Sequence, residues 1–175
     1  EFRRVLFRSD QLVTGSLTTG ASTQSYHFRL LQDRTLAIDV LQAGTQRWNL
    51  RDRFSTLVSN TALKDSDNYN RTDIQGLTLP AGEYEMTISA AAGPFQFRWL
   101  DTANAALVGP DLVQEVVHTP ANSTRLMAFE GTVGTPWSYV GQPATGFARR
   151  PYVMVWTPSG RMLTYDFADG RSEEH

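Results

Sequence analysis

The chain contains 175 residues, 41% of them hydrophobic and 19% charged, and this length predicts one domain or two small ones. Sixteen basic and 18 acidic residues give a net charge of −2, and Lys64 is the only lysine, so nucleic acid is not an expected partner. The absence of cysteine excludes disulfides, zinc–thiolate sites, iron–sulfur clusters and thiol nucleophiles, and without a run of 18 apolar residues we expect no membrane insertion.

Both ends of the chain differ from the rest in composition. Residues 1–9 read EFRRVLFRS, with three arginines and no clear period, and residues 171–175 read RSEEH. Both segments resemble translated sequencing-adaptor DNA, and a natural terminal strand is the alternative. We therefore expect 1–9 and 171–175 to be non-native segments outside the domains.

Alternation of apolar and polar residues predicts strands through the first 100 residues. The predicted strands cover 24–31, 34–41 and 48–50, then 77–79, 83–88 and 95–99. Between two of them, Pro80-Ala81-Gly82 predicts a short reversal that joins paired strands. The predicted core consists of the large residues on the apolar faces, which are Tyr26, Phe28, Trp48, Tyr84, Phe95, Phe97 and Trp99.

Three further segments interrupt or follow these strands. The polar stretch 60–75 predicts an exposed loop, and 101–107 resembles a single helical turn. Val108-Gly109-Pro110-Asp111 predicts a joint between two units. Strands separated by turns, without amphipathic helices, indicate an all-β antiparallel sandwich or barrel and exclude parallel α/β folds.

A weak internal repeat divides the chain. Residues 22–28, STQSYHF, align with 123–129, STRLMAF, at a shift of 101 residues, and Trp48-Asn49-Leu50 aligns loosely with Met154-Val155-Trp156. We therefore expect one complete unit over 10–109 and a truncated second unit over 110–170. An incomplete sandwich leaves unpaired edges, so the second unit is expected to be the less stable part.

The order of these motifs resembles bacterial pre-peptidase C-terminal (PPC) domains, especially tandem copies in large secreted or surface proteins. Leu79-Pro80-Ala81-Gly82-Glu83-Tyr84 is the most specific match. The Pro-x-Gly turn expected after Trp48-Asn49-Leu50 is missing there, but Pro158-Ser159-Gly160 has it in the second unit. The resemblance implies a jelly-roll-like β-sandwich, an extracellular or cell-surface location, and no catalysis by the module itself.

Residues that could support catalysis are sparse. Outside the two ends the only histidines are His27 and His118, and no G-x-S-x-G, Walker or H-E-x-x-H motif occurs. Glu83 and Glu85 share the polar face of a predicted strand, where solvated surface carboxylates are the simpler interpretation. We expect no enzyme activity and assign no catalytic, cofactor-binding or metal-binding residue.

Two binding sites remain as alternatives. The loop residues Asp65, Asp67, Asn70 and Asp73 carry oxygen donors of the kind that calcium prefers, although the loop does not follow the EF-hand order. Three aromatic residues at or near a predicted loop could stack on sugars: Trp137, Tyr139 and Phe147. Trp48, Trp99 and Trp156 fit core faces better.

The leading functional hypothesis is a non-catalytic accessory module of a large secreted or surface bacterial protein, serving in spacing, presentation or weak adhesion. Its partners would be neighbouring domains of the same polypeptide. The alternative is a module that binds carbohydrate or another surface polymer, in a form that calcium could support. A third hypothesis is an enzyme fragment whose catalytic residues lie outside this chain.

Overall fold

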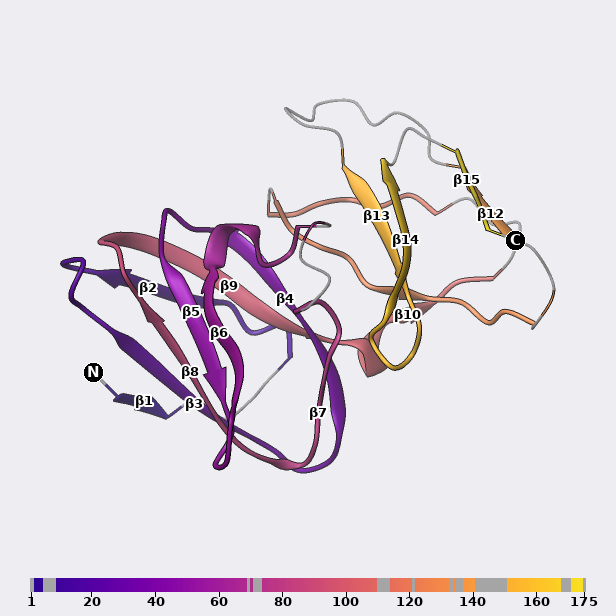
Figure 1. Cartoon of the computed structure of the whole chain (residues 1–175). Coiled ribbons are helices and arrows are strands. Elements are labelled where there is room, and N and C mark those ends of the chain that lie inside the picture. The colour runs from indigo at the N-terminus through magenta and orange to yellow at the C-terminus, as the bar shows by residue number, and fades with distance from the viewer. Residues whose placement is uncertain are drawn as a thin grey trace.

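The computed structural model describes residues 2–4, 9–68, 70, 74–109, 114–120, 122–132, 134, 137–140, 151–167 and 171–174, with the backbone alone for 2–4, 137, 139–140 and 171–174. Two sheets face each other across one core (Figure 1). Sheet one has the strand order β1-β3-β8-β5-β6, and sheet two has the order β2-β9-β4-β7. The predicted all-β, antiparallel jelly-roll-like sandwich is therefore confirmed.

Sheet one is antiparallel except at its β1 edge, where β1 runs parallel to β3. Its strands are β1 (Phe2–Arg4), β3 (Gln24–Leu30), β8 (Gly82–Ser89), β5 (Arg47–Arg51) and β6 (Thr56–Ala62). Sheet two is antiparallel throughout and contains β2 (Val13–Leu17), β9 (Gly93–Asp101), β4 (Arg34–Gln42) and β7 (Leu77–Leu79).

The remaining elements are short. Two 3-10 helices, η1 (Leu63–Asp65) and η2 (Thr102–Asn104), flank the sandwich strands. Three two-stranded sheets follow, which pair β10 (Ala106–Leu107) with β11 (Met127–Ala128), β12 (Trp137–Val140) with β15 (Arg171–Glu174), and β13 (Tyr152–Trp156) with β14 (Met162–Phe167). Within the described part of the chain, no helix is long and apolar enough to cross a membrane.

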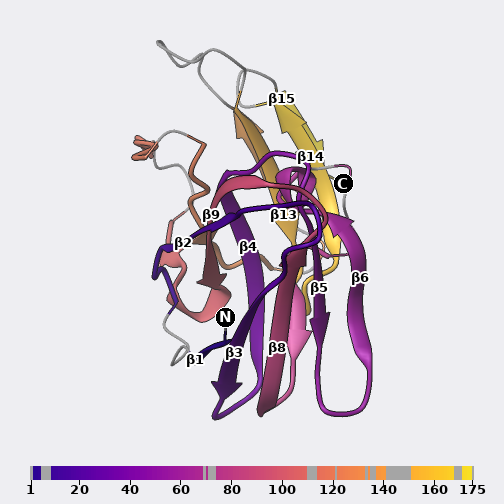
Figure 2. The same ribbon diagram turned by 90° about the vertical axis from the view of Figure 1, so that its left-hand side faces the viewer.

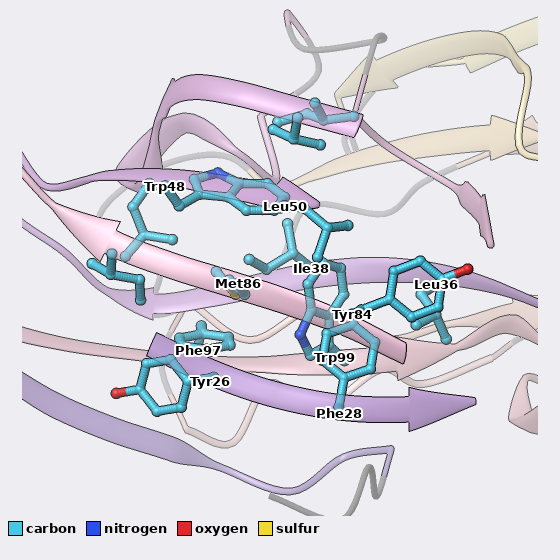
Figure 3. Packing of buried hydrophobic residues seen from close by; sticks show 14 of the residues in the cluster. Tyr26, Phe28, Leu36, Ile38, Trp48, Leu50, Tyr84, Met86, Phe97 and Trp99 are labelled. Atoms are coloured by element: carbon cyan, nitrogen blue, oxygen red, sulfur yellow. The ribbon is translucent and has the colours of Figure 1, made fainter. Parts of the chain in front are cut away.

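The core lies between the two sheets, and all seven predicted core aromatics are buried in it. Figure 3 shows Trp48, Tyr84 and Trp99 among them. Trp48 of β5 and Trp99 of β9 meet edge to face across the sandwich, with ring centroids 5.8 Å apart. The indole N–H of Trp48 donates to the Ser66 hydroxyl at 2.6 Å, so the polar group of this buried ring is satisfied. Alternation therefore predicted the core correctly because each of these strands buries one face.

The reversal predicted at Pro80-Ala81-Gly82 does not join paired strands, and this prediction is wrong. β7 pairs with β4 in sheet two, whereas β8 pairs with β3 and β5 in sheet one. The segment is a corner that carries the chain between sheets. The Asp33 carboxylate accepts the Ala81 N–H at 2.9 Å, and the Tyr84 hydroxyl donates to the Pro80 carbonyl at 2.6 Å, which braces the corner.

Where the structure describes the stretch 60–75, at 60–68, 70 and 74–75, it is not an exposed loop. Residues 60–62 belong to β6, and Leu63, Ser66 and Ile74 are buried. Alternation misses β6 because its register against β5 is irregular and Asn60 has a φ of 47°, so buried side chains do not recur at every second position. By contrast, the helical turn predicted at 101–107 is present as η2, with the Asp101 carboxylate capping the Ala103 N–H.

The aligned repeat segments occupy dissimilar positions. Phe28 lies in β3 and is 7% exposed in the core, whereas Phe129 follows β11 and is 42% exposed. β3 has the antiparallel partner β8, but β11 pairs in parallel with β10. The strand pairing around 123–129 therefore differs from the pairing around 22–28. The equivalence of these two phenylalanines is wrong, and a partial second unit over 110–170 stays a prediction.

The end segments and the predicted joint are described only in part. Residues 2–4 pair with β3 as β1, and residues 171–174 pair with β12 as β15. The non-native origin of 1–9 and 171–175 stays a prediction. Pro110 and Asp111 of the predicted joint lie outside the described residues, while the Val108 N–H donates to the Ala128 carbonyl at 2.7 Å.

Candidate functional site at the junction of the sandwich and the C-terminal half

The outer face of sheet two carries a buried ion pair. Asp39 of β4 and Arg98 of β9 are directly opposite in the strand register, so their side chains point the same way. Arg98 Nε lies 2.6 Å from Asp39 Oδ2, and the exposed fractions of the two side chains are 13% and 0%. The sequence pattern places these residues on the solvent side of the sheet, but another part of the chain covers them.

The covering segment is 122–128, and Thr124 is its point of attachment. The Thr124 N–H donates to Asp39 Oδ1 at 3.0 Å, and Arg98 donates to the Thr124 carbonyl at 3.1 Å. The ion pair therefore holds both backbone groups of one residue. His118 Nδ1 lies 2.6 Å from the carbonyl of the buried Ser123. This contact ties the chain just before the covering segment to the segment itself. We name Asp39, Arg98 and Thr124 the clamp.

A second attachment involves Asp67, which follows η1. β7 pairs only with residues 34–36 of β4, and farther along β4 the Val40 N–H donates to Asp67 Oδ2 at 2.9 Å. The Asp67 side chain thus replaces a strand partner at this edge. The Tyr152 hydroxyl of β13 donates to the Asp67 carbonyl at 2.7 Å, so this loop also holds the β13–β14 hairpin.

The electrostatics of Asp67 are unusual. Burial raises the pKa of its carboxyl from 3.8 to about 7, the Val40 N–H opposes this change, and the nearby charges of Asp39 and Asp65 reinforce it. A carboxylate away from water and beside other carboxylates favours its neutral form. Asp67 is therefore a group whose charge changes close to neutral pH at the junction.

The turn of the β13–β14 hairpin forms the third attachment. An isolated two-stranded sheet is marginally stable in water, and this one lies against the edge of sheet two near β7 (Figure 1). The Thr78 hydroxyl donates to the Ser159 carbonyl at 3.1 Å. Gly160 meets Gly76 backbone to backbone, with φ values of 84° and 63°. The turn predicted at Pro158-Ser159-Gly160 is therefore present, and it makes the contact.

Replacing Gly160 with alanine is expected to loosen the hairpin. The added Cβ would overlap the carbonyl oxygen of Gly76, and its backbone would be strained at a positive φ. We expect a loss of about 1–3 kcal/mol in the free energy of unfolding, measured by urea denaturation. The control is Gly131→Ala, because nothing lies within 4 Å of a Cβ at Gly131. Equal stability of the two variants would show that the Gly76 contact contributes nothing.

The outer face of sheet one brings one predicted histidine and one predicted carboxylate together. His27 Nε2 lies 3.9 Å from Glu85 Oε1, and Arg51 Nε donates to Glu85 Oε2 at 2.6 Å. Burial acts to raise the pKa of Glu85, but hydrogen bonds from Arg51 and Ser25 and the charges of Arg51 and His27 hold that pKa below its ordinary value. The Ser25 hydroxyl is thus bonded to the acid, whereas an activated serine nucleophile donates to a histidine.

The other predicted site residues are not gathered into one site. Glu83 is exposed on the same strand as Glu85, and His118 lies in the approach to the clamp. In the predicted calcium loop the Asp67 carboxylate accepts the Val40 N–H, Asn70 is exposed, and Asp73 lies outside the described residues. Among the residues that the structure describes, no group of three or more His, Asp or Glu side chains could hold a metal ion.

The predicted aromatic platform is likewise not assembled by the described side chains. Trp48 and Trp99 lie in the core, as expected, and Trp156 is half-buried in β13. The side chains of Trp137 and Tyr139, and the whole of Phe147, lie outside the described residues. Sugar binding by these aromatics stays a prediction.

Sequence reasoning missed the clamp, although β4 contains a signal for it. Residues 36–41 read LAIDVL, a nearly continuous apolar run of the type found in strands buried on both faces. Asp39 interrupts that run, and an aspartate in a doubly buried strand requires a partner. Arg98, on a strand with the same alternation, is a candidate partner. Thr124 could not be found in this way, because it lies in a segment without regular structure.

Comparisons with known proteins gave structural likenesses only. No family model matches the sequence, and no curated protein matches it. The solved structures that are similar include the pre-peptidase C-terminal domain of a collagenase from Bacillus anthracis, with 16% identity, a TM-score of 0.40, and coverage of 58% of this chain and 94% of that one. They also include PliG, a periplasmic inhibitor of g-type lysozyme from Salmonella Typhimurium, with 15% identity, a TM-score of 0.41, and coverage of 57% and 98%.

The first of these structures carries the family name that the sequence motifs resemble. PliG from Aeromonas hydrophila is a further likeness, with 15% identity, a TM-score of 0.37, and coverage of 57% of this chain and 94% of that one. The sandwich assignment itself rests on the strand pairing described above.

Proposed function

We propose that the chain is a non-catalytic structural module of an extracellular or cell-surface protein. We propose further that the sandwich holds the segment 122–128 and the β13–β14 hairpin of the same polypeptide in a fixed direction. The clamp is the observation that supports this proposal most directly. A flexible linker leaves its backbone to water and its direction free. Here both backbone groups of Thr124 bond to a buried ion pair on the sandwich.

The chemistry of the clamp suits a positional role. Removing two charges from water is costly, and a buried pair adds little net stability compared with apolar residues of the same volume. The pair contributes a fixed geometry instead. The planar guanidinium donates in fixed directions to Asp39 and to the Thr124 carbonyl, and the carboxylate accepts the Thr124 N–H. The two further attachments, at Asp67 and at Gly76, extend this fixed geometry to the β13–β14 hairpin.

Because the 175-residue chain contains no cysteine, this rigidity can be tested directly. Two exposed residues, Glu83 on the sandwich and Glu130 after β11, can be replaced with cysteine and spin-labelled. Double electron–electron resonance is expected to give one narrow distance distribution for the intact chain. A broad distribution, of the kind a flexible linker gives, would show that the module fixes no direction and would overturn the proposal.

A further inference from the structure

The four sheet edges of the sandwich are not equally protected. An exposed edge offers unpaired backbone groups to any extended chain, and proteins blunt such edges with short strands, bulges or covering side chains. β7 is three residues long, and the register of β6 against β5 shifts twice. At the β2 edge the Gln24 side chain donates to the Ser16 carbonyl at 3.0 Å. Three of the four edges therefore carry one of these protections.

The fourth edge, that of β3, is regular. β3 pairs with β8 over seven consecutive positions, Gln24–Leu30, without a shift of register. On its other side lies β1, in which residues 2–4 pair in parallel with residues 25–27 (Figures 1 and 2). The other strand pairs described for this sheet are antiparallel. Among the described residues, three thus cover an edge that is seven residues long.

The segment that occupies this edge indicates the kind of partner that the edge accepts. Residues 1–9 differ in composition from the rest of the chain, and we predict a non-native origin for them. A segment of that origin was not selected to fit β3, so its pairing depends on backbone groups that every extended, proline-free peptide offers.

The orientation of β1 argues against a second copy as the partner. Two copies related by a twofold axis would pair their β3 edges with each other, and such an axis makes the two strands antiparallel. The strand on this edge is parallel to β3. A segment unrelated to β3 therefore fits the observed pairing better than another β3 does.

We propose that the β3 edge, residues 24–30, is a strand-addition site that binds an extended, proline-free peptide segment of a partner protein as a parallel strand. Residues 2–4 occupy this site in the present chain and are exchangeable for such a segment. Backbone hydrogen bonds supply the affinity in this mode of recognition. The site belongs to sheet one and does not depend on the clamp, which lies on sheet two.

The test opens the edge and offers it a peptide. In the Arg3→Pro/Arg4→Pro variant, β1 loses two N–H groups and cannot form its ladder. Arg3→Ala/Arg4→Ala is the matched control, because it removes the same side chains and keeps both N–H groups. The probe is a fluorescein-labelled synthetic peptide with the sequence of residues 1–9. By fluorescence anisotropy we expect it to bind the proline variant at least about tenfold more tightly than the alanine variant, in which it must displace β1.

Hydrogen exchange gives a second readout. The β3 amides that face β1 should exchange at least about tenfold faster in the proline variant than in the alanine variant, and the peptide should restore their protection. Circular dichroism verifies that both variants fold. If the proline variant unfolds, the full chain with a fluorophore at Glu1→Cys decides the question, because excess peptide should displace the labelled end and lower the anisotropy of the label.

Three results would overturn the proposal. They are no binding of the peptide to a folded proline variant, equal binding to the alanine variant, and equal binding of a peptide that carries proline at its third and fourth positions. Dimerisation of the proline variant without peptide binding, detected by sedimentation velocity, would also overturn it and would assign the edge to a second copy.

Discussion

Replacing Arg98 with methionine is expected to lower the free energy of unfolding by about 3–5 kcal/mol, because it leaves Asp39 buried without its counter-ion. Methionine keeps most of the apolar stem of arginine, so the change isolates the guanidinium. For a chain of this size the loss corresponds to a fall of about 6–20 °C in melting temperature, measurable by calorimetry. Arg51→Met is the matched control, since Arg51 pairs with Glu85 at the surface, and its loss should cost about 1 kcal/mol or less.

The Asp39→Leu/Arg98→Met double variant separates stability from position. Replacing both buried charges with apolar residues of similar volume is expected to recover most of the lost stability. The Thr124 N–H and carbonyl then have no partner on the sandwich. We therefore expect a stable protein in which the Thr124 amide exchanges hydrogen quickly and the distance between labels at residues 83 and 130 becomes broad. A stable double variant with unchanged exchange at Thr124 would show that the clamp does not hold the segment.

Alternation predicted the strands whose burial follows a local rule. In β3, β8 and β9 the buried core residues recur at every second position, so the apolar residues of the sequence show which side of each strand faces the core. The same rule fails at β6, where an irregular register and the left-handed Asn60 break the period. Strand identity is local information, and for that reason most of the sandwich could be predicted.

The identity of the partner strand is not local information. Pro80-Ala81-Gly82 has the composition of a tight turn, but whether its flanking strands pair with each other depends on β4, β3 and β5. The clamp fails to appear for the same reason. The apolar run around Asp39 indicates that this residue needs a partner, but the sequence does not show that the irregular segment around Thr124 covers it. The candidate site therefore lies where residues far apart in sequence meet. The alternation of apolar and polar residues along one strand cannot predict such contacts.

Stability should also depend on pH through Asp67. The folded chain raises the pKa of this carboxyl from 3.8 to about 7, so between those pH values the folded state holds a proton that the unfolded state has released. The free energy of unfolding is therefore expected to fall as pH rises from about 4 to 7 and then to level off. The interval between the two pKa values corresponds to about 4 kcal/mol, an upper limit for the loss.

Asp67→Asn is expected to remove this dependence. The amide oxygen can still accept the Val40 N–H, but asparagine has no proton to release. We expect the variant and the unaltered chain to be about equally stable at pH 4, and the variant to be more stable at pH 8 by up to about 4 kcal/mol. Urea denaturation at several pH values measures the difference.

The control for this substitution is Asp10→Asn, which makes the same chemical change at an exposed residue with a φ of 65° that asparagine also tolerates. It should leave the pH profile unchanged. A loss of stability in Asp67→Asn at pH 8 would mean that the ionised carboxylate, rather than a neutral one, is the form that the junction favours. In that case the hydrogen bond from the Val40 N–H to the carboxylate would outweigh the burial of Asp67 and the charges of Asp39 and Asp65.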